Sequence, residues 1–445
     1  MRHFNWRYAS VFAAIGFVAV GVNETQAAGF QLRETNSKKF GYAHAGSATE
    51  AGDVAAQWDN PATLTTLDKN AVGASVMGVF PQVKYDITRS TGVTGASING
   101  NDGDNGGTPA AIPAAYVAWH VNQTLRLGLG ITAPWGLKTD YNKDWRGTLF
   151  ATRSSLESVN VNPAFALKLN DMFSIGGGFS IEYIKAVLGE GFEKINAAGN
   201  TSEARLQGND VGYGFNAGIL FQPWKHTRFA LAYRSQIKHS LSGDFRVSDR
   251  ANNRFGALLA PDATKVRADV TLPETVTFSA HHDINAKWNV RADIQFTRWA
   301  RLNEIDINYD WRPSAALLAA GAITQSKEIY KNRNTWFFAL GTGYQWTEST
   351  LLKVGVAYDK GMTRNNYRSP RIPDANRLWL SAGLEQKFTD SITGSLDYTF
   401  IHVKNANINL NGQRNQGKSA LVGRNFVARS KAYVNLIGAK IQWKF

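Results

Sequence analysis

The sequence predicts an all-β protein, a 14-stranded antiparallel transmembrane β-barrel. Three observations predict it: apolar residues alternate with period two after residue 69, the connections are alternately short and long, and an aromatic residue ends the last alternating segment. Short turns at one end and long loops at the other are typical of outer-membrane barrels, which contain an even number of strands. A closed sheet also satisfies its backbone hydrogen bonds internally, as crossing lipid requires.

The alternation is clearest in residues 211–221, where large apolar side chains fall on odd positions and small or polar ones on even positions. Successive residues of a strand point to opposite faces, so this segment has one apolar face. The segments 125–132 and 336–341 repeat the pattern, and the spacing of an amphipathic helix fits none of them. The final segment carries a lipid-facing stripe formed by Tyr433, Ile437, Ala439, Ile441, Trp443 and Phe445.

The connections divide into two classes, and counting the segments between them gives 14 strands. Two- or three-residue polar connections favour β-hairpins. They occur at 122–123, 170–171, 224–226, 285–286, 347–349 and 389–390. The long connections are 87–112, 136–156, 188–209, 248–266, 306–331, 363–374 and about 408–425.

Residues 1–27 have the pattern of a secretory signal peptide. Arg2 and Arg7 precede a twelve-residue apolar stretch at 11–22, and small residues lead to a cleavage site before Ala28. The apolar stretch is too short to span a bilayer, and no later run reaches the roughly 18 residues of a transmembrane helix. We therefore expect the mature chain in the cell outer membrane of a Gram-negative bacterium.

The amino-acid composition excludes several kinds of functional site. The 445 residues carry a formal net charge of 49 − 35 = +14 and contain no cysteine, which excludes disulfides, thiolate-ligated metals and a thiol nucleophile. In an outer-membrane protein, we expect this positive charge to face anionic lipid and lipopolysaccharide rather than nucleic acid. We expect a monomer.

Residues 28–68 do not alternate. They contain small-residue stretches and the sequence Asn60-Pro61-Ala62. A segment of about 40 residues before such a barrel would either fill the lumen as a plug or form a periplasmic tail, and composition does not distinguish the two.

At several places the chain resembles the FadL-type outer-membrane transporters of long-chain fatty acids and other hydrophobic compounds. The matching segments occur in the family's order along essentially the whole mature chain. They are 28–32 (AGFQL), Asn60-Pro61-Ala62, 133–137 (APWGL), 233–235 (YRS), 272–274 (LPE) and 372–383 (IPDANRLWLSAG).

This resemblance implies a hatch at 28–68 inside a barrel at 69–445. It also implies passive transport of long-chain fatty acids or similar hydrophobic molecules, gated by hatch movement around Ala28, Phe30 and Asn60-Pro61-Ala62. The alternatives are a channel for aromatic hydrocarbons or alkanes and, from other classes, a general porin or an adhesin.

The sequence predicts no catalytic residue, metal site or cofactor. There is no Gly-x-Ser-x-Gly motif, and the adjacent His281 and His282 would point to opposite faces of a strand, which is poor geometry for one metal ion. Residues 412–419 (GQRNQGKS) match the P-loop pattern, but they follow an Asn-rich segment and precede an alternating strand. A P-loop requires a buried strand before it and a helix after it, so we interpret this segment as a polar surface loop.

The alternation places two arginines on lumenal faces beside aromatic residues. Arg333 shares its face with Phe337, and Arg377 shares its face with Trp379. A guanidinium group can bind a carboxylate through two hydrogen bonds while aromatic side chains contact an acyl chain, so these four residues are the predicted substrate site. The resemblance supports Arg377 more strongly. The alternative is an arginine ladder paired with the lumenal carboxylates of Glu385 or Asp293.

Pro134 and Gly136 fall at the end of the third predicted strand. Proline removes a ladder donor and glycine weakens pairing, so the strand should be kinked there or simply end in a loop. The resemblance implies that such a kink forms a lateral opening to the membrane. Residues 313–323 form an apolar stretch in a long external loop, either a landing surface for hydrophobic molecules or a helix packed on its neighbours.

Overall fold

The computed structural model describes residues 29–445 except 34, 36, 143, 194–200, 249–255 and 412–423. The predicted signal peptide, the hatch residue Ala28 and the P-loop-like segment 412–419 therefore lie outside the described residues. No helix in the described part of the chain is long and apolar enough to cross a membrane.

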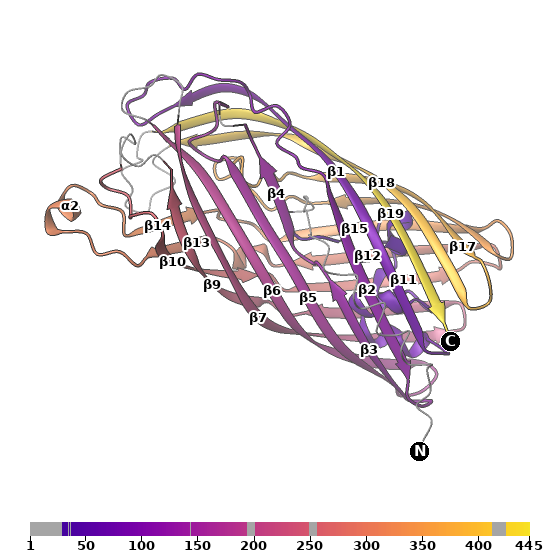
Figure 1. Cartoon of the computed structure of the whole chain (residues 1–445). Helices are drawn as coiled ribbons and strands as arrows, with labels where there is room; N and C mark the ends of the chain where they lie inside the picture. Colours follow the sequence, from indigo (N-terminus) through magenta and orange to yellow (C-terminus); the bar gives the residue numbers. More distant parts are fainter. Residues whose placement is uncertain are drawn as a thin grey trace, which may run out of the picture.

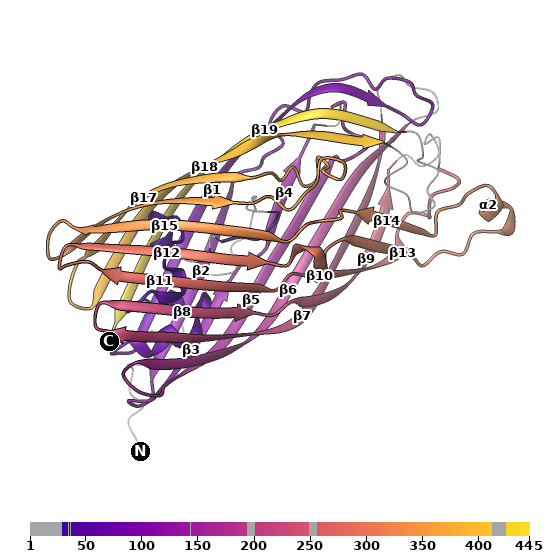
Figure 2. The same cartoon turned by 180° about the vertical axis from the view of Figure 1, so that it is seen from behind.

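In this part of the chain, 19 strand segments form one antiparallel sheet that closes where β1 pairs with β19 (Figures 1 and 2). Five barrel strands consist of two segments each, namely β3/β4, β8/β9, β10/β11, β12/β13 and β14/β15, so 19 − 5 = 14 strands form the barrel. The predicted fold class is confirmed.

The bounds of the first strands are β1 Ala71–Thr91, β2 Ala110–His120, β3 Leu125–Thr132, β4 Gly136–Asp140, β5 Arg153–Lys168, β6 Phe173–Glu193, β7 Thr201–Trp224, β8 Thr227–Arg234, β9 Ile237–Val247 and β10 Thr264–Leu272. Those of the others are β11 Thr275–Asp283, β12 Trp288–Thr297, β13 Glu304–Tyr309, β14 Gln325–Ile329, β15 Thr335–Gln345, β16 Thr350–Asp359, β17 Arg377–Lys387, β18 Ile392–Asn411 and β19 Asn425–Lys444.

The barrel has two unlike ends. The short turns and the last residue of the chain lie at one end, and the long connections, with the short helix α2 Ala315–Ala319, lie at the other (Figure 1). By the rule for outer-membrane barrels, the first end is periplasmic and the second extracellular. Several strands extend far into the predicted loops; β1 reaches Thr91 and β18 reaches Asn411. These extensions keep their backbone pairing but present polar side chains outward, so the apolar alternation fades before the strand ends.

The segment before β1 lies in the lumen as a hatch, which excludes the alternative of a periplasmic tail. It folds into four 3₁₀-helices, η3 Ser37–Tyr42, η4 Ser47–Thr49, η5 Val54–Trp58 and η6 Pro61–Thr66, visible as indigo ribbons inside the barrel (Figure 1). Helix η3 contacts β15 to β19, and η6 contacts β5 to β7. The side chains of Asp53 and Asn60 cap η5 and η6 by accepting hydrogen bonds from the amides of Ala55 and Ala62.

Buried ion pairs fix the hatch to the barrel wall. Asp53 pairs with Lys440 of β19, and Glu50 pairs with Arg291 of β12. The carboxylate of Asp293 accepts hydrogen bonds from the amide of Gly46 at 2.7 Å and from Ser47. Removing one partner of a buried ion pair costs about 3–5 kcal/mol, so these contacts oppose movement of the hatch core.

The helix in the apolar segment 313–323 is more exposed than a helix packed on its neighbours would be. Helix α2 has no buried residue, and the side chain of Leu318 is 53% exposed. The helix projects away from the barrel at the extracellular end (Figures 1 and 2). It is therefore not packed on its neighbours.

Candidate ligand tunnel and N-terminal latch

Two adjoining cavities lie in the barrel on the extracellular side of the hatch. The inner cavity, of about 840 Å³, is lined by apolar side chains from the barrel wall and by Phe30 of the hatch. The outer cavity, of about 1270 Å³, has a mixed polar and apolar lining. The side chains common to both linings are Leu188, Leu206, Ile307, Tyr330 and Arg371.

Two buried arginines form the polar part of the outer cavity. The guanidinium group of Arg371 lies 3.1 Å from a carboxylate oxygen of Glu190 and 3.5 Å from one of Glu328. Arg424 contacts the other oxygen of Glu190 at 2.6 Å. Arg371 is thus the cationic group at the boundary between the polar and the apolar cavity.

An aromatic cluster surrounds Phe30, which lines the apolar cavity. The ring of Phe30 lies 5.0 Å from that of Trp299 and 5.8 Å from that of Trp135, and the two tryptophan rings are 5.9 Å apart. All three side chains are buried. Trp135 lies in the interruption between β3 and β4, and Trp299 lies in the interruption between β12 and β13. At both places the irregular backbone directs a large side chain into the barrel.

The third barrel strand is interrupted where Pro134 predicts a kink. Strand β3 ends at Thr132, β4 begins at Gly136, and among the described residues no ladder joins β2 to β4. The hatch occupies the inner side of this interruption: the amide of Leu32 donates to the carbonyl of Pro134 at 2.8 Å, and the amide of Gly136 donates to the carbonyl of Phe30 at 2.9 Å. The N-terminal segment is therefore hydrogen-bonded directly to the kink.

A buried carboxylate fixes the start of this segment. Asp374 accepts hydrogen bonds from the amide of Gly29 at 3.2 Å, from the amide of Met362 at 2.6 Å and from Arg377 at 2.8 Å. Arg377 also lies 3.7 Å from Asp359. Because Asp374 and Arg377 are almost fully buried, the pair is shielded from solvent screening. We call Gly29, Asp374 and Arg377 the N-terminal latch.

The four predicted substrate residues lie at the level of the latch. Arg377, Trp379 and Phe337 face the lumen, as the alternation predicts, with Trp379 fully buried against Phe337 and the hatch residue His44. Arg333 lies between β14 and β15 and donates to the carbonyls of Gly361 and Thr363. None of the four lines the two large cavities, so their contact with a ligand stays a prediction.

The alternative, in which the arginine pairs with carboxylates, holds for Arg377, but the predicted partners Glu385 and Asp293 are wrong. Arg377 pairs with Asp374 and Asp359, and Asp293 binds the hatch instead. Alternation could not identify Arg371, because it lies in the connection between β16 and β17, where no strand period applies. The predicted geometry of His281 and His282 is confirmed, since one is buried and the other exposed on β11.

The predicted hatch motif Asn60-Pro61-Ala62 contacts the wall at two glycines. The side-chain amide of Asn60 donates to the carbonyl of Ala48 at 2.9 Å and to that of Ile219 at 3.2 Å. A Cβ atom at Gly218 would lie 1.9 Å from the Asn60 side-chain oxygen, and one at Gly176 would lie 2.5 Å from the Ala62 nitrogen. These glycines permit the close approach of the hatch.

A closed 14-stranded barrel with a lumenal hatch and an internal apolar cavity defines a class of outer-membrane transport proteins. This chain belongs to the outer membrane protein transport protein family (OMPP1/FadL/TodX), whose sequence model matches residues 18–445. It is accordingly a protein of the cell outer membrane.

Relatives match nearly the whole chain. The Long-chain fatty acid transport protein of Salmonella typhi is 30% identical, covering 92% of this chain and 96% of that protein. Outer membrane protein P1 of Haemophilus influenzae is 26% identical over 100% of both chains.

Solved structures show the same fold. A Pseudomonas aeruginosa FadL homologue superposes with a TM-score of 0.83 at 22% identity, covering 94% of this chain and 100% of that one. The Ralstonia pickettii toluene transporter TbuX superposes with a TM-score of 0.63 at 16% identity, covering 91% and 98%.

Proposed function

We propose that this protein transports long-chain fatty acids passively across the outer membrane. The observation that carries the proposal is the apolar cavity of about 840 Å³ that meets a polar cavity at Arg371. A concave site with a mostly apolar lining and few polar groups suits a small hydrophobic molecule. Relatives that match most of the chain are named long-chain fatty acid transport proteins, which supports fatty acids as the transported molecule.

In this proposal Arg371 receives the carboxylate first. Its guanidinium group can form two parallel hydrogen bonds to a carboxylate, in competition with Glu190 and Glu328, while the acyl chain lies in the apolar cavity. Arg377 and Arg333, with Trp379 and Phe337, would contact the ligand at a later stage, after the latch has opened.

The strength of the contacts favours movement of the N-terminal segment rather than of the whole hatch. Three backbone amides, those of Gly29, Leu32 and Gly136, hold this segment, and each hydrogen bond contributes about 0.5–1.5 kcal/mol. Burial of Phe30 adds about 1.5–3 kcal/mol. A ligand that binds the barrel more tightly when this segment has moved therefore shifts the equilibrium toward the displaced state.

Displacing the hatch core would cost more free energy than displacing the N-terminal segment. The ion pairs of Asp53 and Glu50 with the wall would cost about 3–5 kcal/mol each to break, before the buried apolar side chains are counted. We therefore infer that Phe30 moves while η5 and η6, with Asn60-Pro61-Ala62, stay in place.

With the hatch core in place, the exit would be lateral. The break in pairing at 133–135, with Pro134 at its centre and Gly136 at its edge, lies next to Phe30 and would be uncovered when residues 29–32 withdraw. A proteoliposome assay checks this route with a quencher confined to the bilayer and an acceptor protein trapped inside. Quenching of labelled fatty acid before it reaches the acceptor supports a lateral exit, and the reverse order contradicts it.

The binding site is tested by titrating the detergent-purified barrel with a labelled long-chain fatty acid. The competitors are its methyl ester and toluene, and the variants are Arg371→Ala, Arg377→Ala and, as control, Arg246→Ala, whose side chain is exposed and pairs with Asp262. We expect Arg371→Ala to weaken fatty-acid binding at least tenfold, while the control leaves it unchanged.

A second candidate is a channel for aromatic hydrocarbons, favoured by the nearly apolar lining of the inner cavity. In that case toluene and the ester would compete fully, and Arg371→Ala would leave affinity unchanged. This outcome would overturn the carboxylate site.

A further inference from the structure

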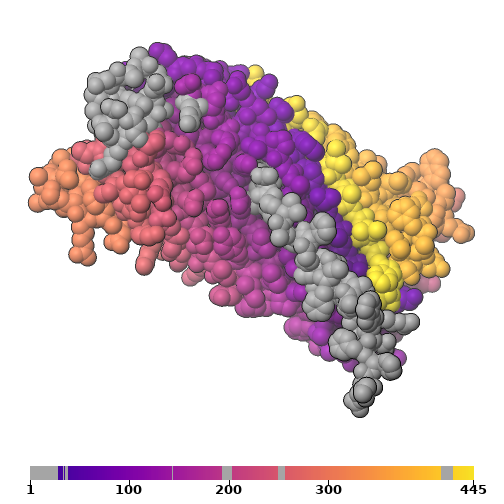
Figure 3. Space-filling model, viewed as in Figure 1, coloured from indigo at the N-terminus to yellow at the C-terminus, as the bar shows by residue number. Residues whose placement is uncertain are grey.

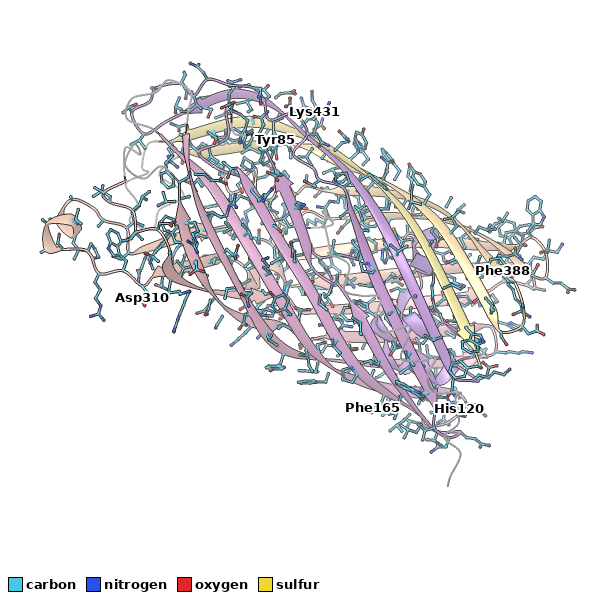
Figure 4. All side chains as sticks on the ribbon, viewed as in Figure 1. Tyr85, His120, Phe165, Asp310, Phe388 and Lys431 are labelled. Carbon is cyan, nitrogen blue, oxygen red and sulfur yellow. The ribbon has the colours of Figure 1, made fainter. Side chains whose placement is uncertain are left out.

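Four basic side chains cluster on the outer surface of the barrel near its extracellular end. Lys84 of β1, Arg429 and Lys431 of β19 and Lys404 of β18 are all exposed, on three adjacent strands. We call these four residues the outer basic patch. In Figure 3 the purple β1 and the yellow β19 lie side by side on the visible face, and Figure 4 labels Lys431 well away from His120 and Phe388, which lie at the end with the short turns.

The strand register brings like charges together. Lys84 is directly opposite Lys431, and both side chains point out of the barrel. Like charges in this position destabilise a sheet, so the arrangement does not serve folding. Asp86 pairs with Lys431 at 2.7 Å and is opposite Arg429, so one carboxylate faces four cations. The patch retains a net charge of 4 − 1 = +3.

The patch begins where the lipid-facing surface ends. On β19 the outward side chains from Trp443 to Tyr433 are mostly apolar, and Lys431 is the next outward residue. Ten residues at about 3.3 Å each, tilted by about 40°, span about 25 Å along the membrane normal, which is the height of the apolar band of outer-membrane barrels. On β1 the exposed Phe80 is likewise followed by Gln82 and Lys84.

This height corresponds to the headgroups of the outer leaflet. Below the patch, the exposed ring of Tyr433 lies 6.0 Å from that of Phe400, which provides an aromatic belt at the interface. A lipid bound here would place anionic groups on the cations and acyl chains along the apolar strands below. The lipid of the outer leaflet with phosphate groups on its sugar headgroup is the lipid A portion of lipopolysaccharide.

We propose that the outer basic patch is a binding site for the phosphate groups of lipid A. Arg429 can bind a phosphate through two hydrogen bonds, and the lysines contribute point charges next to it. The site spans the seam where β1 closes the barrel against β19, so a bound glycolipid would bridge the two terminal strands from outside. The inference is independent of the transported substrate, because the patch faces lipid rather than the lumen.

The test measures binding of purified lipid A to the detergent-solubilised barrel by native mass spectrometry. The probes are bisphosphorylated, monophosphorylated and dephosphorylated lipid A, with phosphatidylglycerol as a second anionic lipid. The variant Lys84→Gln/Arg429→Gln/Lys431→Gln removes three charges of the patch. Its matched control, Lys225→Gln/Lys287→Gln/Lys387→Gln, removes three exposed charges from periplasmic turns.

We expect wild type and control to bind bisphosphorylated lipid A in preference to the other probes, and the patch variant to lose at least tenfold in affinity. Unchanged binding by the patch variant would overturn the proposal, as would equal binding of dephosphorylated lipid A or phosphatidylglycerol. Circular dichroism of the same variant verifies that its barrel is folded, whichever substrate the protein transports. If the triple variant does not fold, Lys84→Gln and Lys431→Gln alone should each weaken binding about fivefold, or about 1 kcal/mol, and no change in either would refute the site.

Discussion

The carboxylate of Asp374 accepts a hydrogen bond at 3.2 Å from the amide of Gly29, a residue 345 positions earlier in the chain. The same carboxylate binds Arg377 at 2.8 Å. The loop before β17 thereby holds the first described residue of the hatch, next to the strand interruption at Pro134.

Replacing Asp374 with alanine should release the N-terminal segment. The change leaves Arg377 buried with only the more distant Asp359, and loss of one partner from a buried pair costs about 3–5 kcal/mol. Hydrogen exchange should accelerate at the amides of residues 30–32, and uptake of labelled fatty acid should rise.

The exposed Asp310 provides the matched control for this experiment (Figure 4), since Asp310→Ala removes a carboxylate at the extracellular end without touching the latch. Equal exchange at residues 30–32 in Asp374→Ala and wild type would show that the latch does not hold the segment.

Phe30→Ala should open the inner cavity. Removal of a buried aromatic ring costs about 3–5 kcal/mol and leaves space between Trp135 and Trp299. We expect fatty acids with longer acyl chains to bind more tightly relative to shorter ones, measured by competition across a chain-length series. The control is Phe165→Ala on the lipid-facing surface, where the ring is half exposed. An unchanged chain-length profile in Phe30→Ala would exclude this residue from the ligand cavity.

Gly218→Ala should unseat η6 from the wall. The new Cβ would lie 1.9 Å from the Asn60 oxygen that caps the helix, and such overpacking costs about 1–3 kcal/mol. Limited proteolysis of the hatch should accelerate. In the control Gly177→Ala the Cβ meets the outward ring of Phe165 at 3.0 Å, which can rotate away. Similar proteolysis of both variants would contradict a specific role of the Gly218 contact.

Acid should destabilise the hatch through His44. Burial, assisted by the charges of Lys39 and Arg33, holds the pKa of His44 well below its ordinary value of 6.5. The unfolded chain therefore binds a proton that the folded hatch does not, so stability is complete above about pH 6.5 and falls as the pH decreases below it.

The measurement is the difference in thermal unfolding temperature between pH 7.5 and pH 5. We expect His44→Asn, which tolerates the positive φ of 71° at this position, to show a smaller difference than wild type. His226→Asn in an exposed periplasmic turn is the control. The same pH dependence in His44→Asn and wild type would assign the acid effect to other groups.

Much of the barrel could be predicted from sequence because its signals are local. Alternation fixes which face each strand residue occupies, so Phe337, Arg377 and Trp379 were assigned correctly to the lumen. Short polar turns separate the strands, and proline cannot donate to a ladder, so both the number of strands and the interruption at Pro134 followed from residue type. The four other interruptions were not predicted, although Pro273, between β10 and β11, gives the same local signal as Pro134.

The candidate site depended on contacts that no local pattern encodes. Which carboxylate pairs with Arg377, and which arginine reaches the cavity, depend on how the connection at 360–376 folds back into the lumen. Composition left the hatch segment equally compatible with a plug and a tail. The structure shows a plug, because the segment is buried against the wall, forms ion pairs with β12 and β19, and approaches the wall closely at Gly218. The sequence by itself therefore determined the barrel, because its strand pattern is local. Only the tertiary structure decided the latch and the two cavities, because their contacts join residues hundreds of positions apart.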